Sequence, residues 1–374
     1  MKSIVVPAAK VQQGNLCLYA TSLKVKDLLT EGFYSVETLD PEDPDGKGYQ
    51  RLLNKARAKK LADYILDGQE TKDAFLPTSI FLATDKHIPY DENTHSIAIN
   101  LSNIGSFSVV DGQHRIEGLR MAANENSSVM QFEVPVNIAI DLPKIAQMCH
   151  FLIVNTTQKS VDKSVEQRIY ARLTEAMDLE DIPNLPRWIK KTVGKGEDEI
   201  AIKIADYLND TKDSPWYQKI EMANEDNETA TISQKSFVKA IKKYLLTASN
   251  PLSTYTLDRQ QKMLLNYWRA IAQILDIQQP TVLYKYNGVE LFSRFTLPFF
   301  SKLHNSGDFK VPTMQKLLVE TFENVQGEYA GVGHPDWWLS GSAASFLNAG
   351  AINIVHQEMA KALIRSGSKK DIEL

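Results

Sequence analysis

The sequence feature that most constrains the fold is a β-prone run that ends at an Asp-Gly pair and continues as a helix. Residues 106–110 contain a phenylalanine and two valines, which favour a strand. Asp111-Gly112 interrupts this run. Ile116 and Leu119 then recur at helical spacing. The sequence therefore predicts a strand-turn-helix unit whose turn lies at residues 111–115.

This turn has the chemistry of an anion-binding site. A helix start leaves backbone N–H groups without intrahelical partners and carries the positive end of the helix dipole. Gly112 has no Cβ to obstruct a ligand, Arg115 offers a planar fork of donors, and His114 can donate or accept a proton near neutral pH. Asp111 is either the N-cap or a carboxylate that faces a metal ion beside a phosphate. The alternative is an ordinary turn in which Gln113 and its neighbours are solvated, and spacing alone leaves both interpretations open.

Composition and charge exclude several classes of protein. The chain has 374 residues, 43% of them hydrophobic and 24% charged, so a packed core and one or two domains are expected. A formal net charge of −4 excludes a surface coated in basic charge, so nucleic acid would bind only at local patches. The two cysteines, Cys17 and Cys149, form no disulfide framework. Because no long apolar stretch is present, we expect a cytoplasmic protein with no membrane association.

Strand-like and helical runs divide the chain into two regions. Strands are expected at residues 4–6, 16–19, 78–83, 96–101, 106–110 and 132–140, with one helix over about 51–66 that ends near Gly68. Further helices are clearest at residues 144–154, 163–177 and 259–276. In the last of these, the residues at helical spacing that should face the core are Leu264, Trp268, Ile271 and Leu275. We expect an α/β (α+β) domain over residues 1–143 and a mainly helical region over residues 144–374 that packs on it.

The turn resembles a known family signature. The string VVDGQHRIEGL at residues 109–119 resembles the signature of the DGQHR-domain proteins, which include the DndB proteins of bacterial DNA phosphorothioation systems. Two further stretches resemble other blocks of that family, Tyr49-Gln50-Arg51 with Asn54 and Arg57, and the run VNTTQK at residues 154–159. The resemblance covers roughly residues 1–180, and only loosely the helical remainder.

This resemblance implies both a fold and a ligand. The family is regarded as related to the ParB/sulfiredoxin fold, in which a glycine followed by a basic residue at a helix start holds the phosphates of a nucleotide. It therefore implies a nucleotide phosphate or a DNA phosphate at Gly112, His114 and Arg115, with Gln113 beside them. It does not distinguish the two ligands.

The second block is also strongly basic. Six basic residues and no acidic residue lie between positions 47 and 60. The spacing of Arg51, Lys55 and Lys59 predicts one basic stripe on a helix, which suits a polyanion. A plain solvated face is the alternative. With two arginines of the helix near residue 163 added, the expected nucleic-acid contacts are Arg51, Lys55, Arg57, Lys59, Arg168 and Arg172.

The third block, at residues 155–160, is dense in short hydrogen-bonding side chains. It is either a loop in which Ser160 or Asp162 caps the next helix, or a part of the site in which Asn155 and Thr156 bind a ribose or a phosphate. Just before it, Cys149-His150 lies in an apolar helical stretch. Because no other Cys or His lies at metal-ligand spacing, we expect core packing there and no metal site.

The sequence leaves open whether the chain is an enzyme. It contains no Walker-type loop and no Gly-x-Ser-x-Gly elbow, so neither a P-loop ATPase nor that type of hydrolase is expected. A ParB-like nuclease or an NTPase is still allowed. The compatible chemistry is phosphoanhydride hydrolysis or transfer, with an NTP and Mg²⁺ as cofactor and Asp111, His114 and Glu117 as catalytic candidates.

Three functions follow from the residues and the resemblance. The first is a DndB-type regulator that binds DNA, expected if Arg51, Arg168 and Lys190 share one face. The second is an NTP-hydrolysing enzyme or nucleotide-gated switch, expected if a deep, closed cavity lies at Arg115. The third is a non-catalytic subunit that assembles with itself or with DNA-modification proteins, expected if Arg115 is bound to a protein carboxylate such as Glu117 and no cavity is open.

Overall fold

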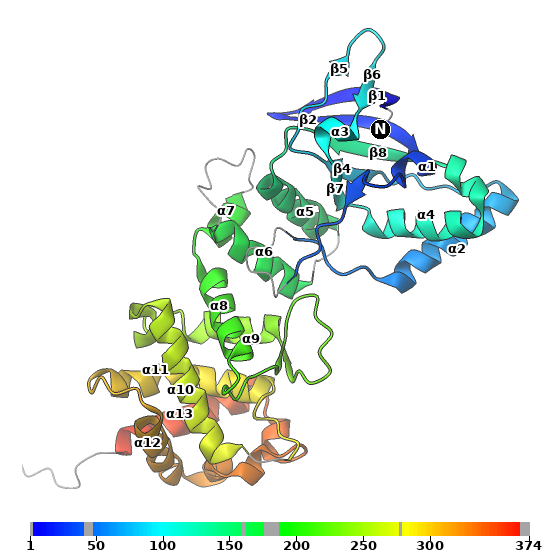
Figure 1. The fold of residues 1–374 in the computed structure, drawn as a ribbon. Coiled ribbons are helices and arrows are strands. Elements are labelled where there is room, and N and C mark those ends of the chain that lie inside the picture. Colours follow the sequence, from blue (N-terminus) through cyan, green and yellow to red (C-terminus); the bar gives the residue numbers. More distant parts are fainter. Residues whose placement is uncertain (1–2, 41–47, 159–161, 176–186, 277–278, 367–374) are drawn as a thin grey trace, which may run out of the picture. The chain divides into compact units, whose positions relative to one another are not determined.

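The computed structural model describes residues 3–40, 48–158, 162–175, 187–276 and 279–366. The chain forms two compact units, Met1–Thr192 and Val193–Leu374 (Figure 1). The first unit holds a sheet with helices, and the second is mainly helical. The expected fold class, an α/β region followed by a mainly helical region, is therefore confirmed. The boundary between the units places the described helices at Lys144–Gln158 and Lys163–Glu175, and all but the last residue of the helix at Arg187–Val193, in the first unit.

The first unit is built on a mixed sheet of eight strands. Their order across the sheet is β3-β7-β4-β8-β2-β1-β6-β5. The strands are β1 (Ile4–Gln13), β2 (Leu16–Lys24), β3 (Tyr34–Ser35), β4 (Ile80–Ala83), β5 (Tyr90–Asp91), β6 (Ser96–Ile99), β7 (Phe107–Asp111) and β8 (Glu133–Ala139). β4 runs parallel to β8 and antiparallel to β7. The register of β4 against β7 shifts between Phe81 and Leu82, next to the point where Phe81 pairs with Asp111. This irregularity lies beside the predicted turn, a place where sheets commonly re-aim a side chain.

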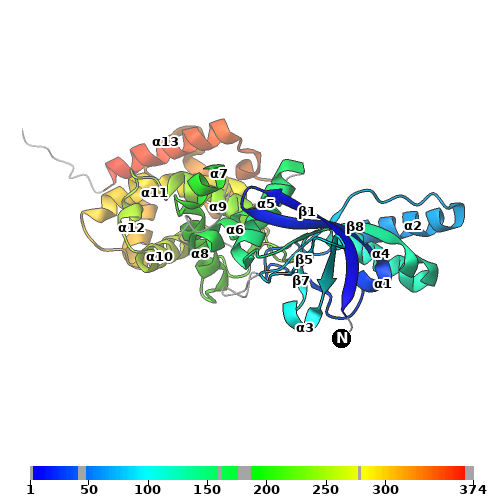
Figure 2. The ribbon, with the colours of Figure 1, turned by 90° about the horizontal axis from the view of Figure 1, so that it is seen from above.

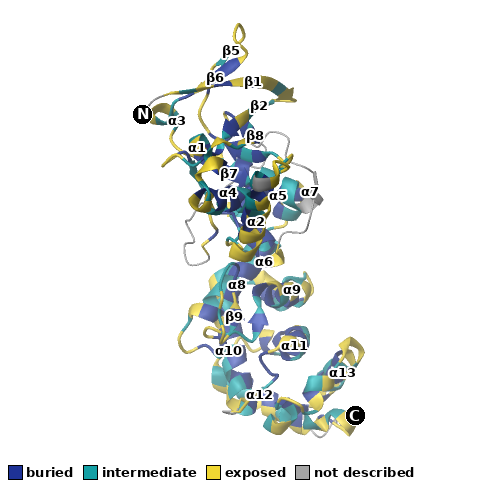
Figure 3. Ribbon diagram, turned by 90° about the vertical axis from the view of Figure 1, so that its right-hand side faces the viewer, coloured by how far each residue is buried: buried dark blue, intermediate teal, exposed yellow. Residues whose placement is uncertain are grey.

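Helices cover the sheet around β7. They are α1 (Val25–Leu28), α2 (Lys55–Thr71), α3 (Leu101–Ile104), α4 (Gln113–Glu125), α5 (Lys144–Gln158), α6 (Lys163–Glu175) and α7 (Arg187–Val193), with a 3-10 helix at Ser127–Gln131. α4 and α5 lie on opposite sides of β7 (Figures 1 and 2). Ile65 of α2 and Leu119 of α4 belong to the same hydrophobic core as Val109 of β7. In Figure 3 the buried residues of this unit gather around β7, β8 and α4.

The second unit is a group of helices around an aromatic core. The helices are α8 (Glu197–Asp210), α9 (Gln234–Tyr244), α10 (Leu257–Leu275), α11 (Tyr286–His304), α12 (Val311–Glu323) and α13 (Ala349–Arg365). The shorter elements are β9 (Ile220–Glu221), β10 (Ile232–Ser233) and 3-10 helices at Pro251–Thr254, Gly327–Gly333, Pro335–Trp338 and Ala343–Phe346. The rings of Trp268 and Phe237 each contact the ring of buried Trp216. The residues predicted to face the core, Leu264, Trp268, Ile271 and Leu275, are all buried.

Three local predictions need correction. α2 begins at Lys55, because the side chain of Asn54 accepts the N–H of Arg57 and caps the helix there. Arg51 therefore precedes the helix and is not part of a helical stripe. The helix also continues past Gly68 and ends at Thr71, and Lys72 caps it in the left-handed conformation. Residues 155–158 continue α5 rather than form a loop.

The cap of α6 is the acidic one of the two that the sequence allowed. Asp162 accepts the backbone N–H of Ser164 at 2.8 Å. The other candidate, Ser160, lies outside the described residues. None of the described helices combines the length and the apolar character required to cross a membrane.

Candidate phosphate-binding site at the start of helix α4

The strand-turn-helix unit predicted from the sequence is present. β7 ends at Asp111, α4 begins at Gln113, and Gly112 between them has a φ of 111°. L-amino acids other than glycine rarely adopt this conformation. A Cβ at this position would also lie 3.2 Å from a side-chain carbon of Ile80. Only glycine therefore fits this turn without strain.

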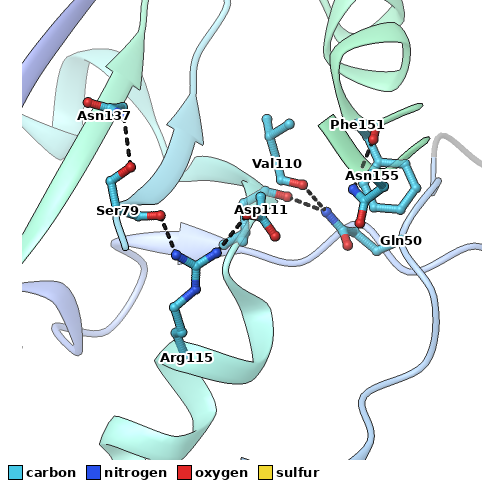
Figure 4. Close-up of polar contacts among 9 residues, drawn as sticks. Gln50, Ser79, Val110, Asp111, Arg115, Asn137, Phe151 and Asn155 are labelled. Carbon is cyan, nitrogen blue, oxygen red and sulfur yellow. Dashed lines mark hydrogen bonds and ion pairs between the residues drawn. The ribbon is translucent and has the colours of Figure 1, made fainter. Parts of the chain in front are cut away.

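Arg115 joins three parts of the site. Its guanidinium donates to Asp111 Oδ2 at 2.6 Å and to the backbone carbonyl of Ser79 (Figure 4). The hydroxyl of Ser79 accepts in turn from the side-chain amide of Asn137 at 2.9 Å. Arg115 thus ties the start of α4 to the end of β7 and to the residue before β4. The side chain of Arg115 is 19% exposed, so part of it is in contact with solvent.

Gln113 and His114 hold the segment that precedes α2. The side-chain amide of Gln113 donates to the carbonyl of Arg51 at 3.2 Å. The backbone N–H of Asn54 donates to Nε2 of His114 at 3.1 Å. One residue earlier, the buried amide of Gln50 donates to the carbonyls of Val109 and Val110 (Figure 4). The block around residue 51 is therefore fixed against β7 and α4 at several points.

The hydrogen bond to His114 determines its protonation. Because Nε2 accepts a hydrogen bond from the backbone N–H of Asn54, this nitrogen carries no proton. The ring is therefore neutral, with its proton on Nδ1. Burial lowers the pKa of His114 to about 4, and the positive charges of Arg51 and Arg57 contribute to the same effect. The ring is therefore neutral at pH 7 and offers an N–H donor at Nδ1.

These residues line a cavity of about 930 Å³ within the first unit. Arg51, Arg57 and Arg115 line it together with one carboxylate, that of Asp111. Apolar side chains form the rest of the wall, among them Phe81. The lining thus combines an excess of positive charge with an apolar surface, as small-molecule sites often do.

The positive charge at the cavity is not neutralised. In the described part of the chain, neither Arg51 nor Arg57 makes an ion pair through its guanidinium, whereas Arg115 is paired with Asp111. Burial lowers the pKa of Arg51, and the neighbouring charge of Arg57 adds to this effect. A partly buried guanidinium, that of Arg51, and an exposed one, that of Arg57, repel each other at the cavity and favour an anionic ligand.

Comparison with known protein families gives a match that includes the residues of this site. The model of the DndB family, described as DNA-sulfur modification-associated, matches residues 6–172. Residues 6–172 are therefore similar to the DndB family. The match bears out the resemblance to DndB proteins and covers the turn, the Arg51 block and helices α5 and α6. No curated protein and no solved structure gives a significant match, so the relationship to the ParB/sulfiredoxin fold stays a prediction.

Several predicted site residues of the DndB region lie away from the cavity. Glu117 accepts from the guanidinium of Arg120 at 2.9 Å and is not a lining residue. Asn155 is part of α5, and its amide donates to the carbonyl of Phe151 at 2.8 Å. Thr156 is also in α5, but its side chain lies outside the described residues. Of the three catalytic candidates, the structure brings only Asp111 and His114 to the cavity.

The predicted nucleic-acid contacts divide into two groups. Lys55 and Lys59 are exposed on α2, and Lys59 pairs with Asp63 at 3.0 Å. Arg168 is buried, with only 7% of its surface exposed. Arg172 donates to the carbonyls of Gly48 and Asp40. The two arginines of α6 are therefore buried or engaged with the protein backbone, whereas the cations of α2 face solvent.

Among the lining residues that were not predicted as part of a site, three have polar side chains that bear on its chemistry. Ser79 and Asn137 come from the segment before β4 and from β8, and His150 comes from α5. Burial lowers the pKa of His150. Its neighbour Cys149 is buried, and burial raises the pKa of that thiol to about 12, in agreement with core packing. The described residues contain no group of three His, Cys, Asp or Glu side chains that could hold a metal ion.

Proposed function

We propose that this protein is a DNA-binding, regulatory member of a DNA-sulfur modification system, and that the cavity at the DGQHR turn holds a phosphate of the bound DNA. The observation that carries the proposal is the pair Arg51 and Arg57, which line the cavity without an ion pair among the described residues. Arg51 is partly buried, and such a guanidinium without a paired carboxylate is costly unless an anion binds it, while exposed Arg57 adds a second donor beside it.

The other donors at this place support a phosphate. Gly112 lines the cavity at the start of α4, where the first backbone N–H groups of the helix have no intrahelical partners. The Nδ1–H of His114 is a neutral donor, which matches the acceptor oxygens of a phosphate. Phosphate has more acceptor oxygens than a carboxylate, so it suits two arginines and a helix start better.

The cavity is also arranged before a ligand arrives. Gln113 holds the carbonyl of Arg51, and Gln50 holds the preceding residue against β7. Less conformational freedom is then lost when the ligand binds. The ligand site is therefore a property of the fold and not of a loop that must close.

The proposal is tested by the DNA affinity of a variant that lacks one arginine of the cavity. Fluorescence anisotropy with a labelled oligodeoxynucleotide compares the wild type with Arg57→Ala and with the control Arg259→Ala, which removes an exposed arginine of α10. Loss of one charged contact should weaken binding by roughly 10- to 100-fold, since such a contact contributes about 1.5–3 kcal/mol. The slope of log K against log salt should fall by about 0.7 for a single strand. Equal affinities for the two variants would contradict the proposal.

A nucleotide-gated switch is the second candidate. The cavity volume of about 930 Å³ supports it, because this exceeds the need of a single phosphate group. ATP binding by the same variants tests this candidate, and release of inorganic phosphate from ATP, with Asp111→Asn alongside, tests hydrolysis. ATP that binds tightly and does not compete with DNA would favour the switch over the DNA site.

A further inference from the structure

The chain segments that border the cavity display apolar side chains to solvent. Leu52, directly after Arg51, is 52% exposed, and Phe75, directly before the lining residue Leu76, is 70% exposed. Tyr64 on α2 is 45% exposed. These three are among the large hydrophobic side chains that the first unit exposes, and all lie on α2 or the segments beside it.

Phe75 is held in its exposed position. The hydroxyl of Tyr64 donates to the carbonyl of Phe75 at 3.0 Å and accepts the backbone N–H of Phe75 at 3.0 Å. One side chain of a helix thus binds both backbone polar groups of this residue. The phenyl ring is therefore presented to solvent by a fixed piece of backbone.

The same helix carries the exposed cations. Lys55, Arg57, Lys59 and Lys60 are all exposed, and the first acidic residue of α2 is Asp63. Exposed aromatic rings interleaved with cations are typical of surfaces that bind single-stranded nucleic acid, because the bases stack and the phosphates are neutralised. A protein partner that binds these cations through charge alone would not require an exposed aromatic ring beside them.

We propose that the cavity takes one unstacked nucleotide of a DNA strand, whose phosphate contacts Arg51 and Arg57 while an adjacent base stacks on Phe75. The proposal rests on the proposed function and names the form of its ligand. The apolar wall, which includes Leu61, Leu76 and Phe81, covers the inserted base. The cavity of about 930 Å³ lies within the range of about 300–1,000 Å³ that is usual for small-molecule sites.

The position of Phe75 distinguishes the binding of a DNA strand from the binding of a free nucleotide. Phe75 is not among the lining residues, whereas Leu76 and Pro77 are. A mononucleotide inside the cavity therefore gains nothing from this ring. A strand that continues beyond the cavity along α2 does gain from it.

The experiment measures four ligands against five proteins. The ligands are a deoxynucleoside monophosphate, a single-stranded oligodeoxynucleotide, a fully paired duplex, and a duplex with one unpaired base. The proteins are the wild type, Arg57→Ala, Phe75→Ala, Phe75→Trp and the control Phe346→Ala, which removes a phenylalanine that is 79% exposed in the second unit. Phe75→Trp keeps a stacking surface and is expected to bind as the wild type does.

Loss of the Phe75 ring is expected to weaken binding of the DNA strand and not of the mononucleotide. Phe75→Ala should bind the single strand roughly tenfold more weakly and the mononucleotide equally well. The wild type should prefer the duplex that contains an unpaired base, because less stacking must be broken, and Phe75→Ala should lose this preference. Equal single-strand affinity for Phe75→Ala and Phe346→Ala, with Arg57→Ala still weakened, would overturn this inference alone. If Arg57→Ala also binds as the wild type does, the proposed function fails.

Discussion

Replacement of His114 by glutamine should remove a pH dependence from the stability of the first unit. The ordinary histidine pKa of 6.5 falls to about 4 in the folded protein, chiefly because of burial. Between these values the unfolded chain binds a proton that the folded chain does not. The contribution of neutral His114 to the free energy of unfolding is therefore complete above pH 6.5 and is lost as the pH falls toward 4.

The structure sets the size of this effect. A pKa that falls from 6.5 to about 4 corresponds at full weight to about 3 kcal/mol. The His114 ring is only half-buried, so solvent screening reduces the value to about 1 to 2 kcal/mol. Glutamine can accept the N–H of Asn54 through its side-chain oxygen and does not titrate. The variant should therefore lose the pH dependence while it keeps the fold.

Urea unfolding at several pH values between 7.5 and 4.5, followed by circular dichroism and by hydrogen exchange in α4, measures this difference. The decrease in unfolding free energy over that range should be smaller in His114→Gln than in the wild type by about 1 to 2 kcal/mol. The control is His334→Gln, which removes an exposed histidine of the second unit. An NMR titration in which the His114 ring protonates near its ordinary pKa would refute the reasoning.

Three further substitutions test the local structure around the site. In Gly118→Ala the new Cβ would lie 2.8 Å from the carbonyl oxygen of Ala58, so urea unfolding should show a loss of about 1–3 kcal/mol as α2 and α4 move apart. Asn54→Ala removes the cap of α2 and should cost about 1 kcal/mol, with faster hydrogen exchange confined to the first turn of that helix. Gly112→Ala combines a positive φ with contacts to Ile80 and should lower the unfolding free energy by about 1–3 kcal/mol; a melting temperature equal to that of the wild type would contradict this.

Sequence reasoning predicted those parts of the fold that depend on local patterns. The break at Asp111-Gly112 and the helical spacing after it are readable within a dozen residues, and the turn lies where expected. The buried face of α10 follows from the same periodicity. The length of β1 and β2 was underestimated, because the residues of β1 beyond Pro7 pair with β2 and those of β2 beyond Tyr19 pair mainly with β8, which the strand sequences themselves do not show.

Distant partners made the site harder to predict. Arg115 was expected to contact a phosphate, which stays a prediction. It also donates to Asp111, four residues away, and to the carbonyl of Ser79, which is 36 residues away and therefore outside any local pattern. The same holds for Asn137, which lies 58 residues from its partner Ser79. His150 looked like a core residue because it follows buried Cys149, and only the placement of α5 beside β7 brings it to the cavity. Single-sequence patterns do not contain these contacts.

The central claim is that the cavity at the DGQHR turn binds a DNA phosphate. The most direct test is an NMR titration of the isotope-labelled protein with a short oligodeoxynucleotide, followed at the Gly112 amide and at the side-chain N–H groups of Arg51 and Arg57. These signals should shift together and saturate at the affinity measured by anisotropy. If the oligonucleotide binds while these signals stay unchanged, and shifts occur only at other surfaces, the account is contradicted.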